Sequence, residues 1–371
     1  MDLMTVVERP LTDFPRATHD GLPAADHRVA PESAAEMAEL LAAATAEGLV
    51  VMPWGGGTHQ GLGYRIFPEV VASTSRLNRI VAWEPDDLTV VVEAGVPVDV
   101  LEAEIGVRRQ TAALPETTPG ATIGGVIAAG ISGYRRLRYG PSRDRILQTT
   151  IATGDGRLVT AGGRVVKNVS GYDIQRSVFG SMGALGIVTT VCLKLWPRPA
   201  ASATVRVDDP TAALQSLYRP LAVLETRDGG TVYLQGPAEQ VETELHRLGG
   251  DVIDGHHWPA PVTGEVVAGL TVPPADVVVG VERVRSYGPF VAQHGVGRID
   301  VSGDPNADWE GLRAWAESRG GRLTIAAAPD TFVDRFDPWG APPAALGVQR
   351  RLIAAFDPAR TINRGRLPGR L

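Results

Sequence analysis

The sequence has almost no cysteine: Cys192 is the only one among 371 residues. A single thiol cannot form an intramolecular disulfide, and it cannot supply the several thiolates that hold a cysteine-bound iron–sulfur cluster. If electrons leave this chain for such a cluster, we expect another subunit to carry it.

Long apolar runs and a surplus of basic residues are also missing. No stretch approaches the roughly 20 apolar residues that span a bilayer, and the N-terminal "MDLMTVVERPLTDFPRATHDG" lacks the basic start and apolar core of a signal peptide. We therefore expect a cytoplasmic protein that meets the inner face of a membrane only peripherally, through partners. The formal net charge of -6 gives no reason to expect a nucleic acid partner.

The composition is otherwise that of an ordinary globular protein, with 44% hydrophobic and 21% charged residues. A chain of 371 residues exceeds the usual size of one domain, so two domains are the default expectation.

The first 200 residues read as mixed helix and sheet. Met37, Leu40, Leu41 and Ala44 share one face of a helix that ends near Gly48 and leads directly into a strand, "LVVMPW". Further strands are expected at 69–75, on both sides of a turn at 84–87, on both sides of a hairpin turn at 154–156, and before "WPRP"; short helices are expected at 98–105 and after a capping Thr122.

The texture changes after residue 200. The segments from "ATVRV" to "DVID" read as β-α-β-β-α-β, and those from "PFVAQHG" to "RLTIAAA" repeat the latter half of that pattern. An antiparallel sheet with helices on one face is the expected architecture. The final segment begins with a helix on which Val348, Leu352 and Phe356 form an apolar stripe, and it ends in an irregular tail that needs docking to stay ordered.

The most informative stretch is "MPWGGGTHQGLG", a glycine-rich loop at the end of a strand. A dinucleotide-binding G-x-G-x-x-G turn fails, because the sixth position is Gln60 or Ile66 for the two possible starts, and no Gly-Lys-Ser/Thr of a Walker loop occurs. What remains is an anion-binding nest of backbone N–H groups, or a tight turn without a ligand.

Two further glycine-rich segments favour the nest. "TPGATIGG" is expected to present free N–H groups at the start of a helix, where the partial positive charge also attracts an anion. Its small residues would let a flat ligand lie against the backbone, and "SGYDIQRSVFGSMGALGIVT" offers similar contacts. The three segments together predict one extended ligand with a phosphate group and a planar part.

These motifs also carry a family resemblance. "PWGGGTH", "TPGATIGGVIAAGISGYRRLRYGPSRDRIL", "VVKNVSGYD", "FGSMGALGIVTTVCLKLWPRP" and "FDPARTINRGR" resemble the PCMH-type FAD-binding domains of the vanillyl-alcohol-oxidase kind, most closely those in FAD-binding subunits of bacterial glycolate oxidase. The resemblance implies an α+β fold: a two-subdomain FAD-binding domain (1–200), an α+β cap with an antiparallel sheet and ferredoxin-like repeats (201–340), and a C-terminal helix and tail that return to the FAD domain (341–371).

The resemblance also implies a set of cofactor-binding residues. These are Pro53, Gly55, Gly56, Gly57, Thr58, His59, Gly61, Pro119, Gly120, Thr122, Ile123, Gly124, Gly125, Ser132, Gly133, Gly140, Gly186, Ile187 and Asn363. Covalent members of this superfamily often bond the flavin through a histidine at the position that Thr58 occupies here, so we expect non-covalent FAD.

The sequence identifies no catalytic residue. His246, His256, His257 and His294 lack the paired spacing of the family's metal motifs, so no metal site is expected; His294 as a general base stays open.

The densest basic stretch is "YRRLRYGPSRDR". Arg135, Arg138 or Arg143 would suit an anionic substrate or an FAD phosphate, but an exposed loop explains them equally well. Lys167 and Tyr172 either reach the ligand or brace their loop.

The resemblance implies an FAD-binding subunit of a glycolate (2-hydroxyacid) dehydrogenase complex. Its partners would be a larger FAD-binding catalytic subunit and an iron–sulfur subunit, and hydride from a small 2-hydroxyacid would pass to the flavin. A stand-alone flavin oxidoreductase with another small substrate is the first alternative. A scaffold subunit without flavin is the second, and the retained glycine loops argue against it.

Overall fold

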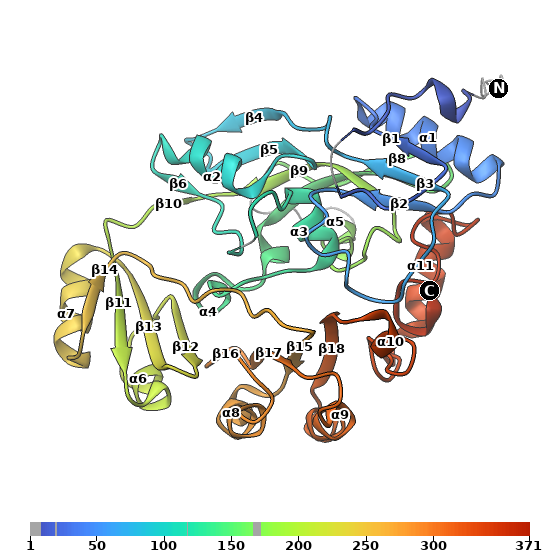
Figure 1. Ribbon diagram of the computed structural model, residues 1–371. Coiled ribbons are helices and arrows are strands. Elements are labelled where there is room, and N and C mark those ends of the chain that lie inside the picture. Colours follow the sequence, from blue (N-terminus) through green and yellow to red (C-terminus); the bar gives the residue numbers. More distant parts are fainter. Residues whose placement is uncertain (1–8, 19–20, 117, 166–171) are drawn as a thin grey trace.

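The computed structural model describes residues 9–18, 21–116, 118–165 and 172–371. Three smaller sheets, of three, five and two strands, are built by the first 200 residues; the two-stranded one pairs β6 with β10. They lie above an eight-stranded antiparallel sheet built by the following residues, and helices cover the outer face of this large sheet (Figure 1). The α+β fold predicted from the sequence is confirmed.

The first sheet is parallel and three-stranded, in the order β1–β3–β2. Helix α1 packs beside it because Met37, Leu40, Leu41 and Ala44 are fully buried, as their spacing predicts, and the Ser33 side chain caps its N-terminus. The bounds are β1 His27–Val29, α1 Ala34–Ala46, β2 Val51–Trp54 and β3 Val70–Ser73.

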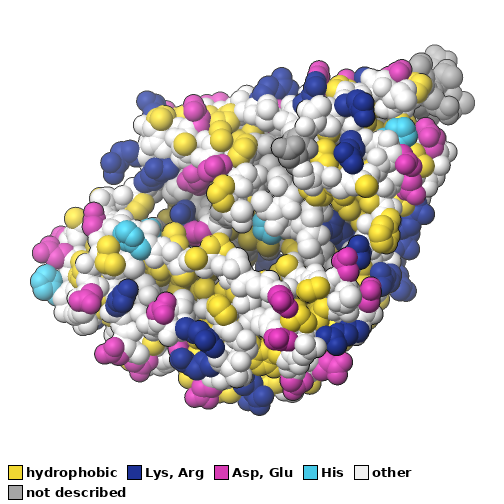
Figure 2. All heavy atoms as spheres, in the orientation of Figure 1, with side chains coloured by type: hydrophobic (Ala, Val, Ile, Leu, Met, Phe, Trp, Pro, Cys, Tyr) yellow, Lys and Arg dark blue, Asp and Glu magenta, His cyan; other side chains and the backbone are white. Residues whose placement is uncertain are grey.

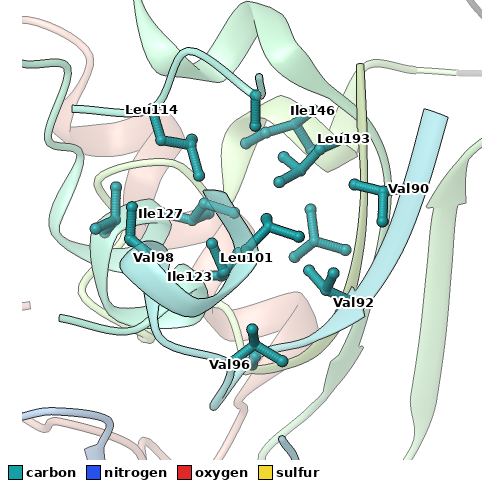
Figure 3. Packing of buried hydrophobic residues seen from close by; sticks show 14 of the residues in the cluster. Val90, Val92, Val96, Val98, Leu101, Leu114, Ile123, Ile127, Ile146 and Leu193 are labelled. Atoms are coloured by element: carbon teal, nitrogen blue, oxygen red, sulfur yellow. The ribbon is translucent and has the colours of Figure 1, made fainter. Parts of the chain in front are cut away.

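The second sheet has five antiparallel strands in the order β4–β5–β9–β7–β8. Val90 and Val92 of β5 face Ile123 and Ile127 of α3 and Leu101 of α2 in the largest core of this half (Figure 3). The bounds are β4 Ile80–Glu84, β5 Thr89–Glu93, α2 Val98–Gly106, β6 Gln110–Thr111, α3 Ile123–Ala129, α4 Arg136–Tyr139, β7 Ile146–Ala152, β8 Leu158–Gly162, α5 Ile174–Ser177, β9 Ile187–Lys194 and β10 Trp196–Pro197.

The large sheet has the order β14–β11–β13–β12–β16–β17–β15–β18. It consists of two β-α-β-β-α-β units with the same internal strand order, joined where β12 pairs with β16. The bounds are β11 Ala201–Val207, α6 Pro210–Ser216, β12 Ala222–Thr226, β13 Gly229–Gly236, α7 Ala238–Leu248, β14 Val252–Asp254, β15 Val266–Thr271, α8 Val277–Val284, β16 Phe290–Gln293, β17 Arg298–Gly303, α9 Trp309–Ser318 and β18 Arg322–Ala327.

The second unit is complete, whereas the sequence predicted only its latter half. The missing elements were β15 and α8. Helix α8 is rich in valine, which disfavours helices by local propensity, but Val277, Val281 and Val284 form a buried stripe against the sheet. Tertiary burial therefore decides the structure of this segment.

The two faces of the large sheet differ in character. In β17, Ile299 and Val301 point into the core under α8 and α9, while Arg298 and Asp300 alternate onto the face that looks toward the first 200 residues. The helices thus cover the outer face and leave the inner face to meet the other half.

The C-terminal helix α11 (Leu346–Phe356) follows the short α10 (Asp330–Val333). The predicted helix is present, but the apolar stripe is not its buried face, because Val348 and Leu352 are 49% and 37% exposed. The helix is rotated so that Ile353 is buried instead, packed with Leu346 and Phe356 against Leu185.

The tail after α11 runs beside β2. Thr361 accepts a hydrogen bond from the Val51 N–H (2.8 Å), and the Asn363 N–H donates back to the Val51 carbonyl (2.9 Å). Asp357 holds the turn into this segment: its Oδ1 and Oδ2 accept from the Thr361 and Ile362 N–H groups at 2.9 and 2.8 Å. Among the described residues, no helix is both long and apolar enough to span a bilayer.

Two helix glycines are expected to respond oppositely to alanine. A Cβ at Gly280 in α8 would lie 2.6 Å from Ile299 Cδ1, whereas one at Gly347 in α11 would meet only Arg351 Nη1, at 3.9 Å. Gly280→Ala should lower the free energy of unfolding by about 1–3 kcal/mol through overpacking, and Gly347→Ala should raise it by up to about 1 kcal/mol. Denaturant titration measures both, and shifts of the same sign would contradict this packing.

Removing the Asp357 carboxylate should destabilise the protein. Asp357→Ala leaves two buried backbone N–H groups without acceptors, so we expect a loss of about 1–3 kcal/mol in the free energy of unfolding and faster proteolysis of the tail. Asp334→Ala, at an exposed carboxylate, is the matched control. Equal stability of the two variants would show that Asp357 does not hold the tail.

Candidate functional site

The glycine loop leaves the end of β2. Within the described part of the chain, the backbone N–H groups of residues 55–59 donate to no protein acceptor. Gly57 has a φ of 73°, and a Cβ there would lie 2.7 Å from the Trp54 ring. The loop therefore offers a run of free donors that only a glycine-rich backbone could arrange.

The glycines of this loop also serve its packing. A Cβ at Gly56 would lie 1.9 Å from the Gly120 carbonyl oxygen, and one at Gly55 would lie 2.3 Å from Thr122 Oγ1. The first and second glycine segments thus touch backbone to backbone. Both interpretations of the loop hold: it is a tight turn by packing, and it still presents unpaired donors.

The sequence predicted free N–H groups at the start of α3, and this prediction is wrong. The Ile123 and Gly124 N–H groups donate to the carbonyls of Val96 and Ala94, and the Gly125 N–H donates to Thr122 Oγ1. Two of these acceptors come from the segment that follows β5 and the third is the helix's own cap, so this helix start offers no anion site.

Helix α3 contributes a face of small residues instead. Ile123, Val126 and Ile127 point into the core, while Gly125, Ala128 and Ala129 line a cavity. A Cβ at Gly125 would meet only Thr122 Oγ1, at 3.1 Å, so the absence of a side chain there leaves room in the cavity itself.

This first cavity has an empty volume of about 630 Å³, part of it open to solvent. The predicted residues that line it are Pro53, Gly55, Gly56, Gly57, Thr58, His59, Gly124, Gly125, Ile187 and Asn363. Sequence reasoning missed Trp54, Gln60, Thr74, Ala128, Ala129, Met182, Gly183, Val188 and Arg366. Ala128 and Ala129 follow Gly125 at helical spacing, which is a signal that could have found them.

The C-terminal tail shapes the glycine loop through Arg366. This side chain is 2% exposed and donates to the Gln60 and Leu62 carbonyls and to Gln60 Oε1, at 2.6–3.0 Å. Burial lowers the pKa of Arg366 to about 10, so the guanidinium stays charged at neutral pH. Since no described carboxylate pairs with it, it leaves a positive charge at the cavity.

Asn363 reaches the cavity from the same tail. Its φ is 48°, its Nδ2 donates to the Met182 carbonyl, and its buried Oδ1 has no hydrogen bond partner among the described residues. A buried acceptor without a partner is costly, which favours a donor supplied by a ligand.

His59 connects two cavities. Its Nδ1 lies 2.9 Å from Thr58 Oγ1, and burial lowers the pKa of its imidazole, which favours the neutral ring. Both His59 and Ala129 line the first cavity and also a second, larger one.

The second cavity lies between the first 200 residues and the inner face of the large sheet, at the hollow across the middle of the molecule in Figure 2. Its empty volume is about 1320 Å³, including open solvent. The predicted Ser132 and Gly133 line it, together with Glu116, Tyr134, Arg136, Gln293, Arg298, Asp300, Thr324 and Trp339 among others.

Several predicted cofactor residues line neither cavity. They are Gly61, Pro119, Gly120, Thr122, Ile123, Gly140 and Gly186. Steric needs explain some of them: a Cβ at Gly61 would lie 2.7 Å from the Ala326 carbonyl oxygen, and one at Gly186 would lie 2.8 Å from that of Ala152.

None of the arginines singled out in the basic stretch lines either cavity. Arg135 pairs with Glu116 at 2.7 Å, Arg138 donates to the Arg219 carbonyl, and Arg143 is exposed beside Asp144. Their neighbour Arg136 lines the second cavity, and nothing in the sequence pattern distinguished it.

Tyr172 is 90% exposed and lines neither cavity, and Lys167 lies outside the described residues. His294 is buried with its Nε2 at 2.9 Å from Glu225 Oε2, and it also lines neither cavity. The described residues hold no cluster of three or more histidine, cysteine, aspartate or glutamate side chains suited to a metal ion.

Comparison with known proteins agrees with this geometry. Residues 25–162 match a family model described as FAD binding domain. Glycolate oxidase subunit GlcE of Escherichia coli is 29% identical over 315 residues, covering 78% of this chain and 84% of that subunit. D-2-hydroxyglutarate dehydrogenase of Xanthomonas citri is 34% identical over 176 residues, and glycolate oxidase subunit GlcD of Bacillus subtilis is 30% identical over 182.

The last two alignments cover 46% and 48% of this chain, and this chain spans only 37% and 39% of those relatives. Among solved structures, an alkyldihydroxyacetonephosphate synthase aligns with a TM-score of 0.64 and 16% identity over 90% of this chain and 74% of that one. That likeness shows a shared fold.

The matched residues contain the glycine loop, the small face of α3 and one wall of the second cavity. The expected FAD cofactor and the resemblance to glycolate oxidase subunits are confirmed. The chain carries an FAD binding domain over residues 25–162 and is an FAD-dependent oxidoreductase that is similar to glycolate oxidase subunits.

Proposed function

We propose that this chain is the FAD-binding subunit of a 2-hydroxyacid dehydrogenase complex of the glycolate oxidase type. The observation that carries the proposal is that the two cavities are neighbours, since His59 and Ala129 line both of them. One extended cofactor in the first cavity would reach from the glycine loop to these shared residues, next to a space where a small substrate fits.

The diphosphate of FAD suits the glycine loop. The free N–H groups of residues 55–59 can each donate a hydrogen bond to a charged oxygen, worth about 1.5–3 kcal/mol apiece before entropic costs. The buried charge of Arg366 adds electrostatic attraction at the same cavity.

The rest of the cofactor suits the small face of α3. Gly125, Ala128 and Ala129 leave space for flat rings, and Asn363 Oδ1 offers an unpaired acceptor. We propose non-covalent binding, since Thr58 stands where covalent relatives have histidine and the neighbouring His59 Nδ1 already contacts the Thr58 hydroxyl. Bound flavin accepts a hydride, so it supplies the redox chemistry that no side chain can.

Partner subunits follow from what this chain's own residues do not provide. Burial raises the pKa of the Cys192 thiol to about 11, so this one cysteine is an inert core residue rather than a redox group. We propose that electrons leave the flavin for a larger FAD-binding subunit and an iron–sulfur subunit. These partners would also hold the chain at the cytoplasmic face of a membrane.

A stand-alone oxidoreductase is the second candidate. It is favoured by the second cavity, which residues from both halves of this chain line and which carries charged side chains.

Gly125→Val tests the cofactor site. The added side chain would enter the first cavity, so we expect at least about tenfold weaker FAD binding, which corresponds to about 1.4 kcal/mol. Gly347→Val, in a helix that lines neither cavity, is the matched control and should keep full flavin content. Flavin absorbance per protein and thermal melts measure binding and folding separately. Stoichiometric FAD in a folded Gly125→Val protein would contradict this site.

Anaerobic mixing with glycolate or lactate tests the assignment of function. If the subunit works only in its complex, the purified chain should be yellow and its flavin should stay oxidised, while a tagged chain should recover two further subunits from its host. Bleaching by the isolated chain would favour the stand-alone enzyme. A colourless folded protein that takes up no added FAD would refute both.

A further inference from the structure

The inner face of the large sheet is polar where it borders the second cavity. Gln293 of β16 and Arg298 of β17 are cross-strand partners, and Asp300 lies two residues along on the same face. All three line the cavity, whereas the alternate residues Ile299 and Val301 are in the core. Polar side chains that face the interior of a protein need polar partners, and a polar ligand in the cavity would supply them.

The arginine of this cluster is held in a built position. Its Nε donates to Asp300 Oδ1 at 2.8 Å, and its Nη2 forms an ion pair with the same oxygen at 2.6 Å. Its guanidinium lies over the backbone of Gly269. A Cβ at Gly269 would come within 1.9 Å of Arg298 Nη2, so only glycine leaves space for the arginine here. Glycine inside a strand lowers stability by roughly 0.5–1 kcal/mol relative to alanine. Nη1 of Arg298 has no partner among the described residues.

Arg136 brings a second guanidinium to the cavity from α4, on the opposite wall. No described carboxylate lies within ion-pair distance of it, and it makes no hydrogen bond to a described residue. Arg136 is exposed at the edge of the cavity, and partial desolvation together with the nearby charge of Arg298 lowers its pKa. Two guanidinium groups that share a cavity repel each other unless an anion lies between them.

The charged side chains around the cavity sum to about one positive charge, which one negative charge on a ligand would neutralise. Asp300 neutralises Arg298, and Arg135 neutralises Glu116 at 2.7 Å. Arg136 remains, so the cavity carries a net charge of about one, which fits a monoanion better than a dianionic phosphate.

Two uncharged groups add a further requirement. Gln293 is 5% exposed, and its Oε1 has no hydrogen bond partner in the described structure. Tyr134 also lines the cavity, and its hydroxyl bonds to no described residue. A buried acceptor is costly unless a donor meets it, and a hydroxyl next to a carboxylate would supply that donor.

We propose that the second cavity is a carboxylate subsite in which Arg136 and Arg298 Nη1 bind the acid group of a small 2-hydroxy monocarboxylate and Gln293 accepts its hydroxyl hydrogen. The inference rests on the proposed function, because it assigns the substrate side of the flavin site. These residues would then determine substrate specificity, whether or not the flavin passes its electrons to partner subunits.

The test uses the FAD-loaded full chain and 2-hydroxyisobutyrate, a 2-hydroxyacid without the α-hydrogen that oxidation would remove. Calorimetric titration should give a dissociation constant that rises at least about tenfold in Arg136→Gln and in Arg298→Gln. Arg143→Gln is the matched control, since Arg143 is exposed in the same basic stretch and lines neither cavity. Gln293→Leu should remove the preference for 2-hydroxyisobutyrate over isobutyrate, which lacks the hydroxyl.

Thermal melts and flavin content establish that each variant is folded and loaded. No binding by the wild type, equal weakening in Arg143→Gln, or unchanged affinity in Arg136→Gln would overturn the subsite, as would equal binding of the uncharged amide of the same acid. If the proposed function is wrong, the flavin measurement shows this independently, because the purified chain then contains no FAD. In that case, apoprotein that still binds the acid and loses binding in Arg136→Gln would support the subsite alone.

Discussion

The close approach of two glycine segments is the contact on which the rest of the site depends. Gly56 lies so near the Gly120 carbonyl that not even a methyl group fits between them, and the Thr122 hydroxyl fills the space beside Gly55. The loop held by this approach lines the cavity, and its N–H groups donate to no described residue. The approach also joins the three-stranded sheet to α3 and the five-stranded sheet behind it.

The C-terminal tail completes what these segments begin. Asp357 fixes the turn into the tail, and the tail then runs beside β2. Arg366, further along the tail, donates hydrogen bonds to carbonyls at the far end of the glycine loop. Residues more than 300 positions apart therefore determine one loop conformation. The tail is part of the cofactor site because of these bonds, and so is the positive charge that it brings.

The sequence predicted those features that depend on local chemistry. The buried face of α1 follows from helical spacing, and the glycine loop at the end of β2 follows from the backbone angles that only glycine adopts readily. Features that depend on distant contacts were not predictable. The face that α11 buries is set by Leu185, and the donors at the start of α3 are satisfied by carbonyls after β5. The same holds for the arginines of the basic stretch. Arg135 pairs with Glu116 and Arg138 donates to a backbone carbonyl, so of these three only Arg136 lines the cavity.

The two halves of the molecule contribute different chemistry to the shared space. The first 200 residues supply mainly backbone donors and small side chains, which recognise the constant part of a cofactor and leave little freedom for substitution. The large sheet supplies side chains from alternating strand positions, where one replacement changes charge or size without moving the backbone. Since Arg298 keeps its place through Asp300 and Gly269, the polar cluster is rigid before any ligand arrives, and a bound acid would lose little energy to reorganising it. Apart from Arg136, the proposed substrate determinants lie on the wall opposite the cofactor, so a fold divided in this way can keep one cofactor while its substrate changes.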